Sequence, residues 1–231
     1  MNERELFPLL EETLRAQLAT RCRRAYHHDM KNGLQGIYGG VDALIRAARA
    51  DKPVSVPLDQ LVQFVRHAIS NHEIGLERVL NNIAPDVESS ATIDVAELLI
   101  ELTRFLMTDA GRVSVRIRSE LANPLQTTTN AARLRLAFLG LITEAVDSMS
   151  GGGEISITGR ATDAGVEIVM ADARAATASI HDAFALDLTA LPLRNGIVLP
   201  TIRYILTSLG GTVECSHSSE GHRTTIRLPS A

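Results

Sequence analysis

The sequence has few cysteines and few aromatic residues, the types that cross-link or fill the core of a small fold. It contains two cysteines and no tryptophan among 231 residues, and aromatic residues make up only 3%. Cys22 and Cys215 lie far apart and form no CxxC or Cys/His spacing, which excludes a disulfide framework and a structural zinc site and is typical of the cytoplasm. With 45% hydrophobic residues, the chain is expected to fold around Leu, Ile, Val and Ala.

Long apolar runs and strong charge are also missing. The start Met1-Asn2-Glu3-Arg4-Glu5 lacks the pattern of a signal peptide, and no apolar segment approaches about 18 residues. We therefore expect a cytoplasmic protein that does not insert in a membrane. The net charge of −4 and the absence of a long basic run argue against nonspecific nucleic-acid binding as the main activity.

One very long helix is predicted from Glu3 to Arg49, with Pro8 near its start. Its apolar positions alternate in steps of four and three, which is typical of a bundle seam. The seam comprises His27, Met30, Leu34, Ile37, Val41, Leu44 and Ala48. This pattern points His27 inward and places His28, about 100° further round, on the solvent face.

A second helix is predicted from Leu58 to Ile83, after a break at residues 51–57 that contains two prolines. Two antiparallel helices cannot enclose their own apolar stripes. We therefore predict a homodimer in which two hairpins form a four-helix bundle. His67 and His72 are five residues apart on different faces, so a metal pair with the first helix is not expected.

Gly33, Gly36, Gly39 and Gly40 interrupt the first helix just after the histidines. Each glycine weakens a helix by up to about 1 kcal/mol relative to alanine. Two explanations remain open at this point: the glycines let a partner protein approach, or they let two helices pack closely.

The pattern changes to mixed helix and strand after a linker at residues 84–90, which predicts domains at 1–85 and 91–231. Helices are expected at Asp94–Met107, Asn130–Met149 and Ile197–Leu209. Strands are expected at 113–118, 154–158, 166–170, 212–216 and 224–228. The triplet at 151–153 precedes a strand, so it is interpreted as a turn and not as a phosphate cradle. The overall class is α+β.

The stretch His28-Asp29-Met30-Lys31-Asn32-Gly33-Leu34-Gln35-Gly36-Ile37 resembles the phosphoacceptor box of two-component histidine kinases. The resemblance implies that His28 carries the phosphoryl group, that Asp29 assists proton transfer, and that Asn32 holds a water or a regulator carboxylate during phosphatase chemistry. A neutral imidazole is a competent nucleophile, which agrees with this role. Docking of a partner would use this face, which includes Arg24, Lys31 and Gln35.

The C-terminal half is similar to the ATP-binding domain of histidine kinases, gyrase and related chaperones, an α/β sandwich. Its last strands, around Gly210-Gly211-Thr212-Val213 and Thr224-Thr225-Ile226-Arg227-Leu228-Pro229, are particularly similar. The resemblance therefore covers nearly the whole chain.

Three nucleotide-binding boxes of that family are altered. Glu144 stands where the family has a magnesium-holding Asn; a carboxylate can ligate magnesium but repels a triphosphate. Gly140 replaces a second polar residue. Asp172 matches the Asp that reads adenine, but the following glycines are missing, and we expect it to be only a turn residue. The last box reads Gly196-Ile197-Val198, with a β-branched residue where bare backbone is usual.

These departures together predict weak or absent ATP binding. The chain looks like the dimeric phosphotransferases of bacterial phosphorelays that retain a degenerate kinase domain. It is expected to pass phosphoryl groups between regulator aspartates and His28, with no cofactor or metal of its own and with Mg²⁺ on the response regulator. Two alternatives remain: an ATP-dependent histidine kinase with an unusual nucleotide site, and a non-enzymatic module that binds a regulator or aids its dephosphorylation.

Overall fold

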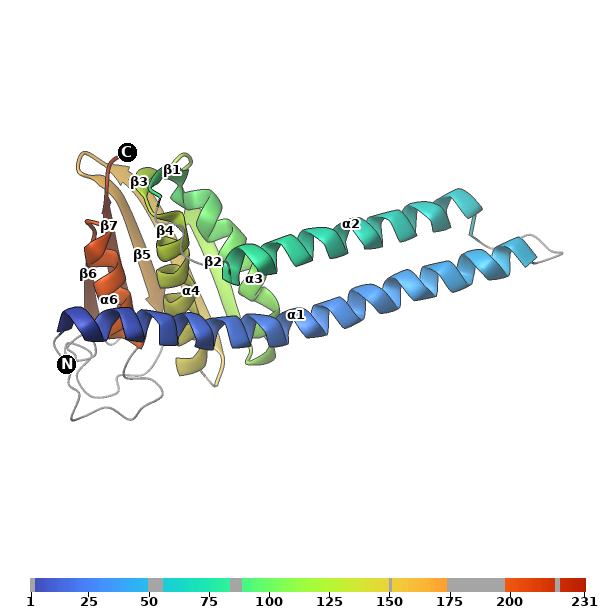
Figure 1. Cartoon of the computed structure of the whole chain (residues 1–231), viewed down its shortest axis with the longest axis horizontal. Helices are drawn as coiled ribbons and strands as arrows, with labels where there is room; N and C mark the ends of the chain where they lie inside the picture. The colour runs from blue at the N-terminus through green and yellow to red at the C-terminus, as the bar shows by residue number, and fades with distance from the viewer. Residues whose placement is uncertain (1–2, 50–55, 84–88, 150, 174–197, 219–220) are drawn as a thin grey trace. The chain divides into compact units, whose positions relative to one another are not determined.

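The computed structural model describes residues 3–49, 56–83, 89–149, 151–173, 198–218 and 221–231 (Figure 1). The chain divides into two compact units. One comprises Met1–Leu18 together with Pro85–Ala231, and the other comprises Ala19–Ala84. We call them the C-terminal unit and the hairpin unit. The first 18 residues, which the sequence analysis assigned to the hairpin, therefore group with the C-terminal unit.

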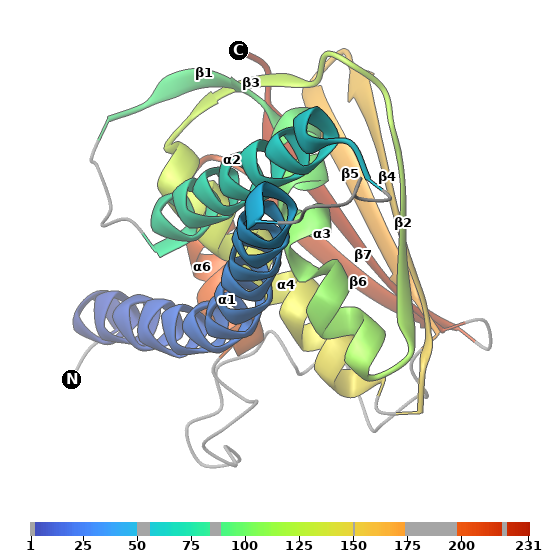
Figure 2. The same ribbon diagram turned by 90° about the vertical axis from the view of Figure 1, so that its right-hand side faces the viewer.

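Helix α1 runs over Glu3–Arg49 and α2 over Leu58–Ile83. The hairpin unit consists of α1 from Ala19 onward and of α2, and both helices begin and end where the sequence predicted. They lie side by side and antiparallel in Figures 1 and 2. A Cβ added at Gly40 would lie 2.5 Å from a Val65 methyl, and one added at Gly33 would lie 3.0 Å from His72 Nδ1. These glycines therefore let α1 and α2 pack closely.

The C-terminal unit is α+β, as predicted. Its five-stranded sheet has the order β2-β4-β5-β7-β6, in which only the β2–β4 pair is parallel. Three helices, α3, α4 and α6, lie on one face of this sheet (Figure 2). The elements are β1 (Ala91–Asp94), α3 (Val95–Arg112), β2 (Val115–Leu121), β3 (Gln126–Thr129), α4 (Ala131–Ser148), β4 (Gly153–Thr162), β5 (Gly165–Asp172), α6 (Val198–Ser208), β6 (Thr212–Ser218) and β7 (Gly221–Pro229).

Local signals start the two long helices of this unit. Asp94 caps α3 by accepting a hydrogen bond from the backbone N–H of Ala96 at 2.8 Å, and it also accepts one from the N–H of Leu125, outside the helix, at 3.2 Å. Asn130 caps α4 by accepting from the N–H of Arg133 at 3.0 Å. Each cap satisfies a donor that the helix itself leaves unpaired. The sequence analysis had counted both capping residues as helical, so its helices begin one residue early. It also ended the first of them at Met107, whereas α3 continues to Arg112.

The core of the C-terminal unit lies between the sheet and its helices. Residues alternate along β5 and β7 between buried and more exposed positions, as expected for strands with one covered face. The largest fully buried side chains there include Leu99, Leu102, Leu125, Leu134, Leu139, Ile142, Ile155, Ile157, Ile168, Ile202 and Ile205. Leucine and isoleucine thus fill the interior, as the shortage of aromatic residues predicted.

Charged side chains form a ladder across four strands. Glu167 on β5 accepts hydrogen bonds from Arg160 on β4 at 2.8 Å and from Arg227 on β7 at 3.0 Å. Arg227 also pairs with Glu214 on β6 at 3.1 Å. The Arg160 and Arg227 guanidinium groups hold the pKa of the Glu167 carboxyl below its ordinary value.

No helix in the described part of the chain combines the length and the apolar character that crossing a membrane requires.

Candidate functional site

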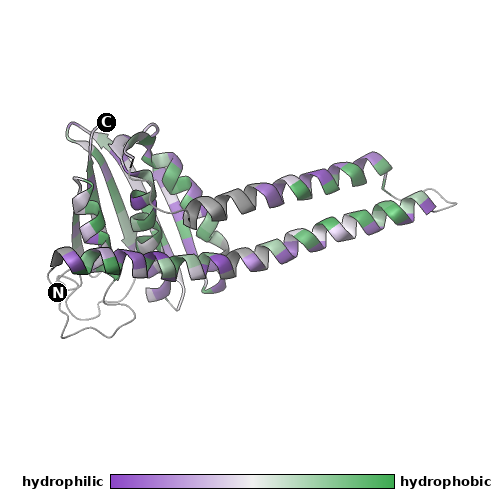
Figure 3. Cartoon of the chain, viewed as in Figure 1, coloured by the Kyte–Doolittle hydropathy of each residue, from purple (hydrophilic) through white to green (hydrophobic). Residues whose placement is uncertain are grey.

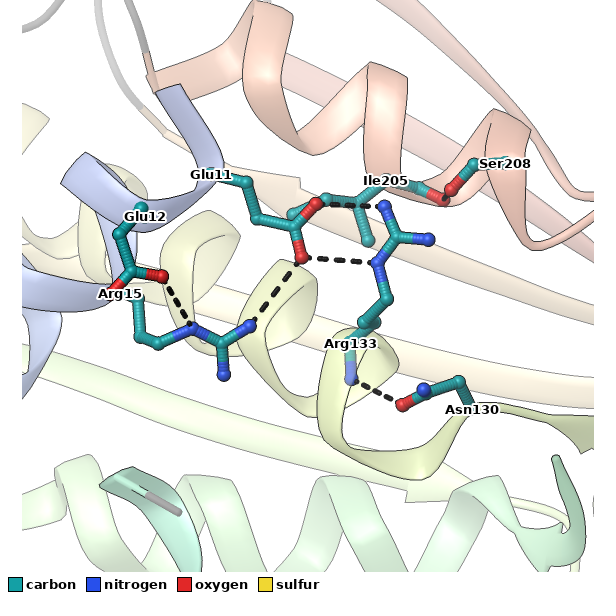
Figure 4. A network of polar contacts seen from close by, with 7 residues as sticks. All are labelled: Glu11, Glu12, Arg15, Asn130, Arg133, Ile205 and Ser208. Carbon is teal, nitrogen blue, oxygen red and sulfur yellow. Dashed lines mark hydrogen bonds and ion pairs between the residues drawn. The ribbon is translucent and has the colours of Figure 1, made fainter. Parts of the chain in front are cut away.

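The first turns of α1 are bound to the C-terminal unit by a polar cluster (Figure 4). Arg133 of α4 donates two hydrogen bonds to the carboxylate of Glu11, at 3.0 and 2.7 Å. Arg15 approaches the same carboxylate at 3.5 Å. Phe7 stacks on Tyr204 of α6 with ring centroids 4.5 Å apart. The sequence analysis missed this attachment. Arg133 is 122 residues from Glu11 in the sequence, and no local pattern indicates that the two residues pair.

The predicted phosphoacceptor residues lie in the hairpin-unit part of α1. His28 and Asp29 are in the helix; their side chains and that of Arg24 are outside the described atoms. Asn32 lies one turn after His28, and its side chain is exposed. Lys31 and Gln35 are exposed as well. The helical repeat puts positions 28, 32 and 35 on one face of α1. The described residues predicted to bind a partner, Lys31 and Gln35, are accessible.

The seam predicted on α1 is in fact two stripes. Gly33, Ile37, Gly40 and Leu44 are buried or half-buried, and the two glycines contact α2. A second row, which we call the exposed stripe of α1, remains in solvent: Leu34, Tyr38, Val41 and Ile45 are 37%, 69%, 38% and 43% exposed. The predicted seam therefore has members in both rows: Ile37 and Leu44 in the first, and Leu34 and Val41 in the second. His27, expected to point inward, is exposed in the single chain.

Helix α2 has an exposed stripe of its own. Leu58, Val62 and Ile69 are 53%, 39% and 41% exposed, and they follow one another at steps of four and seven residues. Phe64 is 55% exposed. Figure 3 shows apolar and polar bands along both helices of the hairpin. Apolar rows at this spacing are the usual contact surface between bundle helices.

Two of the four glycines face open space. No described atom outside the helix lies within 4 Å of a Cβ built at Gly36 or Gly39. They line a groove of about 360 Å³ together with Gln35, Gly40, Ala43, Leu61 and Phe64. The two explanations for the glycines therefore apply to different residues. Gly33 and Gly40 allow helix packing, whereas Gly36 and Gly39 leave room beside the helix.

In the C-terminal unit, the positions of the nucleotide boxes begin on α4. A Cβ added at Gly140 would lie 3.0 Å from Ile202 Cδ1 and 3.7 Å from Leu14 Cδ2. Apolar side chains from α6 and from the start of α1 thus fill the place where a second polar residue was expected. Glu144 is half-buried, and Ser148 donates hydrogen bonds to its backbone carbonyl at 2.8 Å and its carboxylate at 3.4 Å.

Asp172 is not a turn residue, contrary to the sequence prediction. It is the last residue of β5, and its side chain is fully buried. Its Oδ2 lies 3.6 Å from Nδ1 of His222 on β7, whose side chain is also buried. The prediction followed from the missing glycines of the nucleotide box, whereas strand pairing with β7 places the residue in the interior.

The last nucleotide box is described only in part. Gly196 lies outside the described residues, and Val198 is the first residue of α6 and is buried. Among the residues that the structure describes, no three His, Cys, Asp or Glu side chains come together as a metal site would require.

Comparison with known proteins places the fold. No family model matches the sequence, and no curated protein matches it. Solved structures do match. The catalytic domain of the histidine kinase ThkA aligns with a TM-score of 0.56 and 16% identity over 61% of this chain and 95% of that one. The Acinetobacter baumannii histidine kinase AdeS aligns at 0.53 and 16% over 87% and 97%.

A third structure spans almost the whole chain. It is ThkA in complex with the response regulator protein TrrA, and it aligns with a TM-score of 0.53 and 16% identity over 98% of this chain and 67% of that one. At such identities the likeness concerns the fold. The chain therefore has a histidine-kinase-like fold, as the C-terminal resemblance predicted.

Proposed function

We propose that this protein is a dimeric histidine phosphotransferase, which exchanges phosphoryl groups between response-regulator aspartates and His28 without using ATP. Three things support the proposal: the histidine-kinase-like fold, the His28-Asp29-x-x-Asn32 spacing on α1, and the exposure of Lys31, Asn32 and Gln35. A structural neighbour, ThkA, is described in complex with a response regulator. We infer the same class of partner for this chain.

The chemistry requires one nucleophile and accurate positioning. An unprotonated nitrogen of His28 attacks the phosphorus of an aspartyl phosphate; a P–N bond forms and the P–O bond to the regulator breaks, which frees its carboxylate. The proton on the other ring nitrogen passes to Asp29 or to water. Magnesium stays with the regulator. Because phosphoryl transfer depends mainly on alignment and charge stabilisation, a docking surface supplies much of the catalysis.

The observation that supports the ATP-free form is that protein side chains pack against the residues that align with the family's nucleotide boxes. Ile202 and Leu14 pack at Gly140, and Asp172 is buried beside His222. Val198 is buried at the start of α6. A nucleotide held as the family resemblance implies would need polar groups facing open space, so these residues do not fit it.

The dimer rests on the exposed stripes of α1 and α2. Both helices of one hairpin present apolar rows, which a second copy can cover in an isologous contact. A second hairpin would complete a four-helix bundle, with rows at the spacing that bundles use. Glycines Gly36 and Gly39 lie in the groove between the two helices and would admit large side chains of the second copy.

One observation favours an ATP-dependent kinase as a second candidate. The chain keeps carboxylates at two of the nucleotide positions, Glu144 and Asp172, and carboxylates bind magnesium and basic donors. A regulator-binding module that aids dephosphorylation through Asn32 is a third candidate, because that side chain is exposed. The assay below separates the three.

The test follows a labelled phosphoryl group. A receiver domain carrying ³²P-aspartyl phosphate is mixed with the full-length protein, and label on each chain is measured with time. We expect rapid transfer to the wild-type protein, none to His28→Ala, and near-normal transfer to His27→Ala. The two variants are a matched pair of adjacent histidines, and circular dichroism and dimer mass check that both remain folded.

Each other outcome points elsewhere. Label that appears after incubation with ATP alone would support the kinase. Faster loss of label from the receiver with none on this protein would support the phosphatase module, and Asn32→Ala should then abolish the effect. Transfer that survives in His28→Ala would assign the phosphoacceptor to another residue.

A further inference from the structure

A pair of polar side chains is buried on the sheet where β5 pairs with β7. Asp172 and His222 are direct partners across these strands, and their side chains are 0% and 1% exposed. Nδ1 and Oδ2 are 3.6 Å apart, which is longer than a good hydrogen bond. Among the described residues, neither ring nitrogen of His222 has a hydrogen-bond partner. A buried ring without such partners costs free energy, so its presence calls for an explanation.

The backbone around His222 is shaped to bring the ring to this place. Gly221 has φ +124°, a conformation open mainly to glycine. A Cβ at this position would overlap the carbonyl oxygen of Asp172. Only glycine therefore allows the start of β7 to approach the end of β5 so closely. The contact between His222 and Asp172 follows from that approach.

The imidazole ring of His222 occupies a buried space that the Asp172 carboxylate borders. Removal of the buried ring would leave a cavity beside Asp172, and the Asp172 carboxylate would accept a hydrogen bond from the N–H of a ring in the same place. Asp172 is also the residue at which the family resemblance expects a purine base. The structure departs from that expectation, because the imidazole ring of His222 lies beside Asp172.

We propose that His222 is an internal occupant of a pocket for a flat nitrogen heterocycle beside Asp172, and that it closes this pocket to free ligands in the wild-type protein. Removing the ring converts a closed position into a binding site. The inference concerns the C-terminal unit alone and does not depend on phosphoryl transfer at His28.

Thermal unfolding of the full-length His222→Ala variant tests the proposal, with imidazole as the probe. The matched control is Ile226→Ala, which opens a cavity on the same strand at a side chain that is 1% exposed and has no carboxylate partner. Furan serves as the control ligand, because it has a ring of the same size but no N–H. Adenine and ATP are added to the wild-type protein in parallel.

The expected results are a loss and a selective recovery. Each cavity variant should lower Tm by about 5 °C or more. Imidazole at about ten times its Kd should raise the Tm of His222→Ala by about 3 °C. The same imidazole should not stabilise wild type or Ile226→Ala, and furan should stabilise neither variant as much. Asp172→Ala added to His222→Ala should remove the response to imidazole.

Three results would overturn the proposal. They are a folded His222→Ala that imidazole does not stabilise, equal stabilisation of Ile226→Ala, and a clear rise in wild-type Tm with adenine or ATP. If His222→Ala does not fold, refolding from urea with imidazole decides: recovery supports the proposal and failure contradicts it. Labelled transfer at His28 is measured separately, so the two proposals can fail independently.

Discussion

The hairpin unit leaves large apolar side chains in solvent, whereas the C-terminal unit buries nearly all of the ones described. Tyr38 and Phe64 of the hairpin are 69% and 55% exposed. In the C-terminal unit, Leu9 and Met107 are the only described large hydrophobic side chains at a comparable exposure, 58% and 60%. The C-terminal unit thus closes its own core, while the hairpin exposes a surface that association would cover.

The described polar side chains of the two units also lie in different surroundings. The C-terminal unit has a charge ladder on its sheet and a polar cluster that binds residues 3–18. The hairpin exposes Lys31, Asn32 and Gln35 beside its apolar rows. This difference agrees with a division of labour in which one unit provides a stable platform and the other provides contacts with partners.

Charging the exposed stripe should give the largest effect. Val41→Asp would bury one unpaired carboxylate per copy in the proposed bundle, which is costly. We expect the dissociation constant of the dimer to rise by at least about 100-fold. Sedimentation velocity over a range of protein concentrations measures it. Met107→Asp, at an apolar position of the other unit that is 60% exposed, should leave the dimer unchanged. A wild-type protein that stays monomeric would contradict the dimer.

The sequence was informative wherever a repeating pattern determines the structure. Periodicity predicted both helices of the hairpin, and alternation predicted the five strands of the main sheet. It missed β1 and β3, because four-residue strands such as Gln126–Thr129 carry little pattern of their own. Thr127 on β3 donates a hydrogen bond to the Pro229 carbonyl at 2.8 Å, a contact across 102 residues that no local signal announces.

The candidate site residues also differ in how far they could be predicted from the sequence. The motif around His28 is continuous in sequence, so it could be found and named from the sequence alone. The environment of Asp172 depends on His222, 50 positions away, and on Gly221, whose role appears only when β5 and β7 pair. Long-range strand pairing decides burial, and burial reversed the expectation that Asp172 lies in a turn.

The attachment of residues 3–18 gives the next prediction, of intermediate size. Glu11→Gln removes the charge that Arg133 binds through two hydrogen bonds, and leaves a guanidinium that is only 18% exposed without its counter-ion. We expect a loss of about 1–3 kcal/mol in the free energy of unfolding, measured with urea.

Glu12→Gln is the matched control, because Glu12 is one residue along, is 76% exposed and contacts Arg15 at 3.6 Å. It should change stability by no more than about 0.5 kcal/mol. Equal effects of the two substitutions would mean that the first turns of α1 do not belong to the C-terminal unit in solution.

The smallest effect is expected at the charge ladder, and it depends on pH. Arg160 and then Arg227 lower the pKa of Glu167 from its ordinary value of 4.5. A carboxyl with a lowered pKa adds stability above its unfolded pKa and loses it as the pH falls through the folded pKa. The urea midpoint of Glu167→Gln should therefore lie below that of wild type at pH 7, and this difference in midpoint should narrow as the pH falls below 4.5.

A second substitution tests the same interaction. The difference in midpoint that Glu167→Gln causes at pH 7 should be smaller when Arg160→Gln is already present, because one of the two interacting cations is then missing. A difference in midpoint that stays constant from neutral to acid pH would show that Glu167 acts through packing and not through charge.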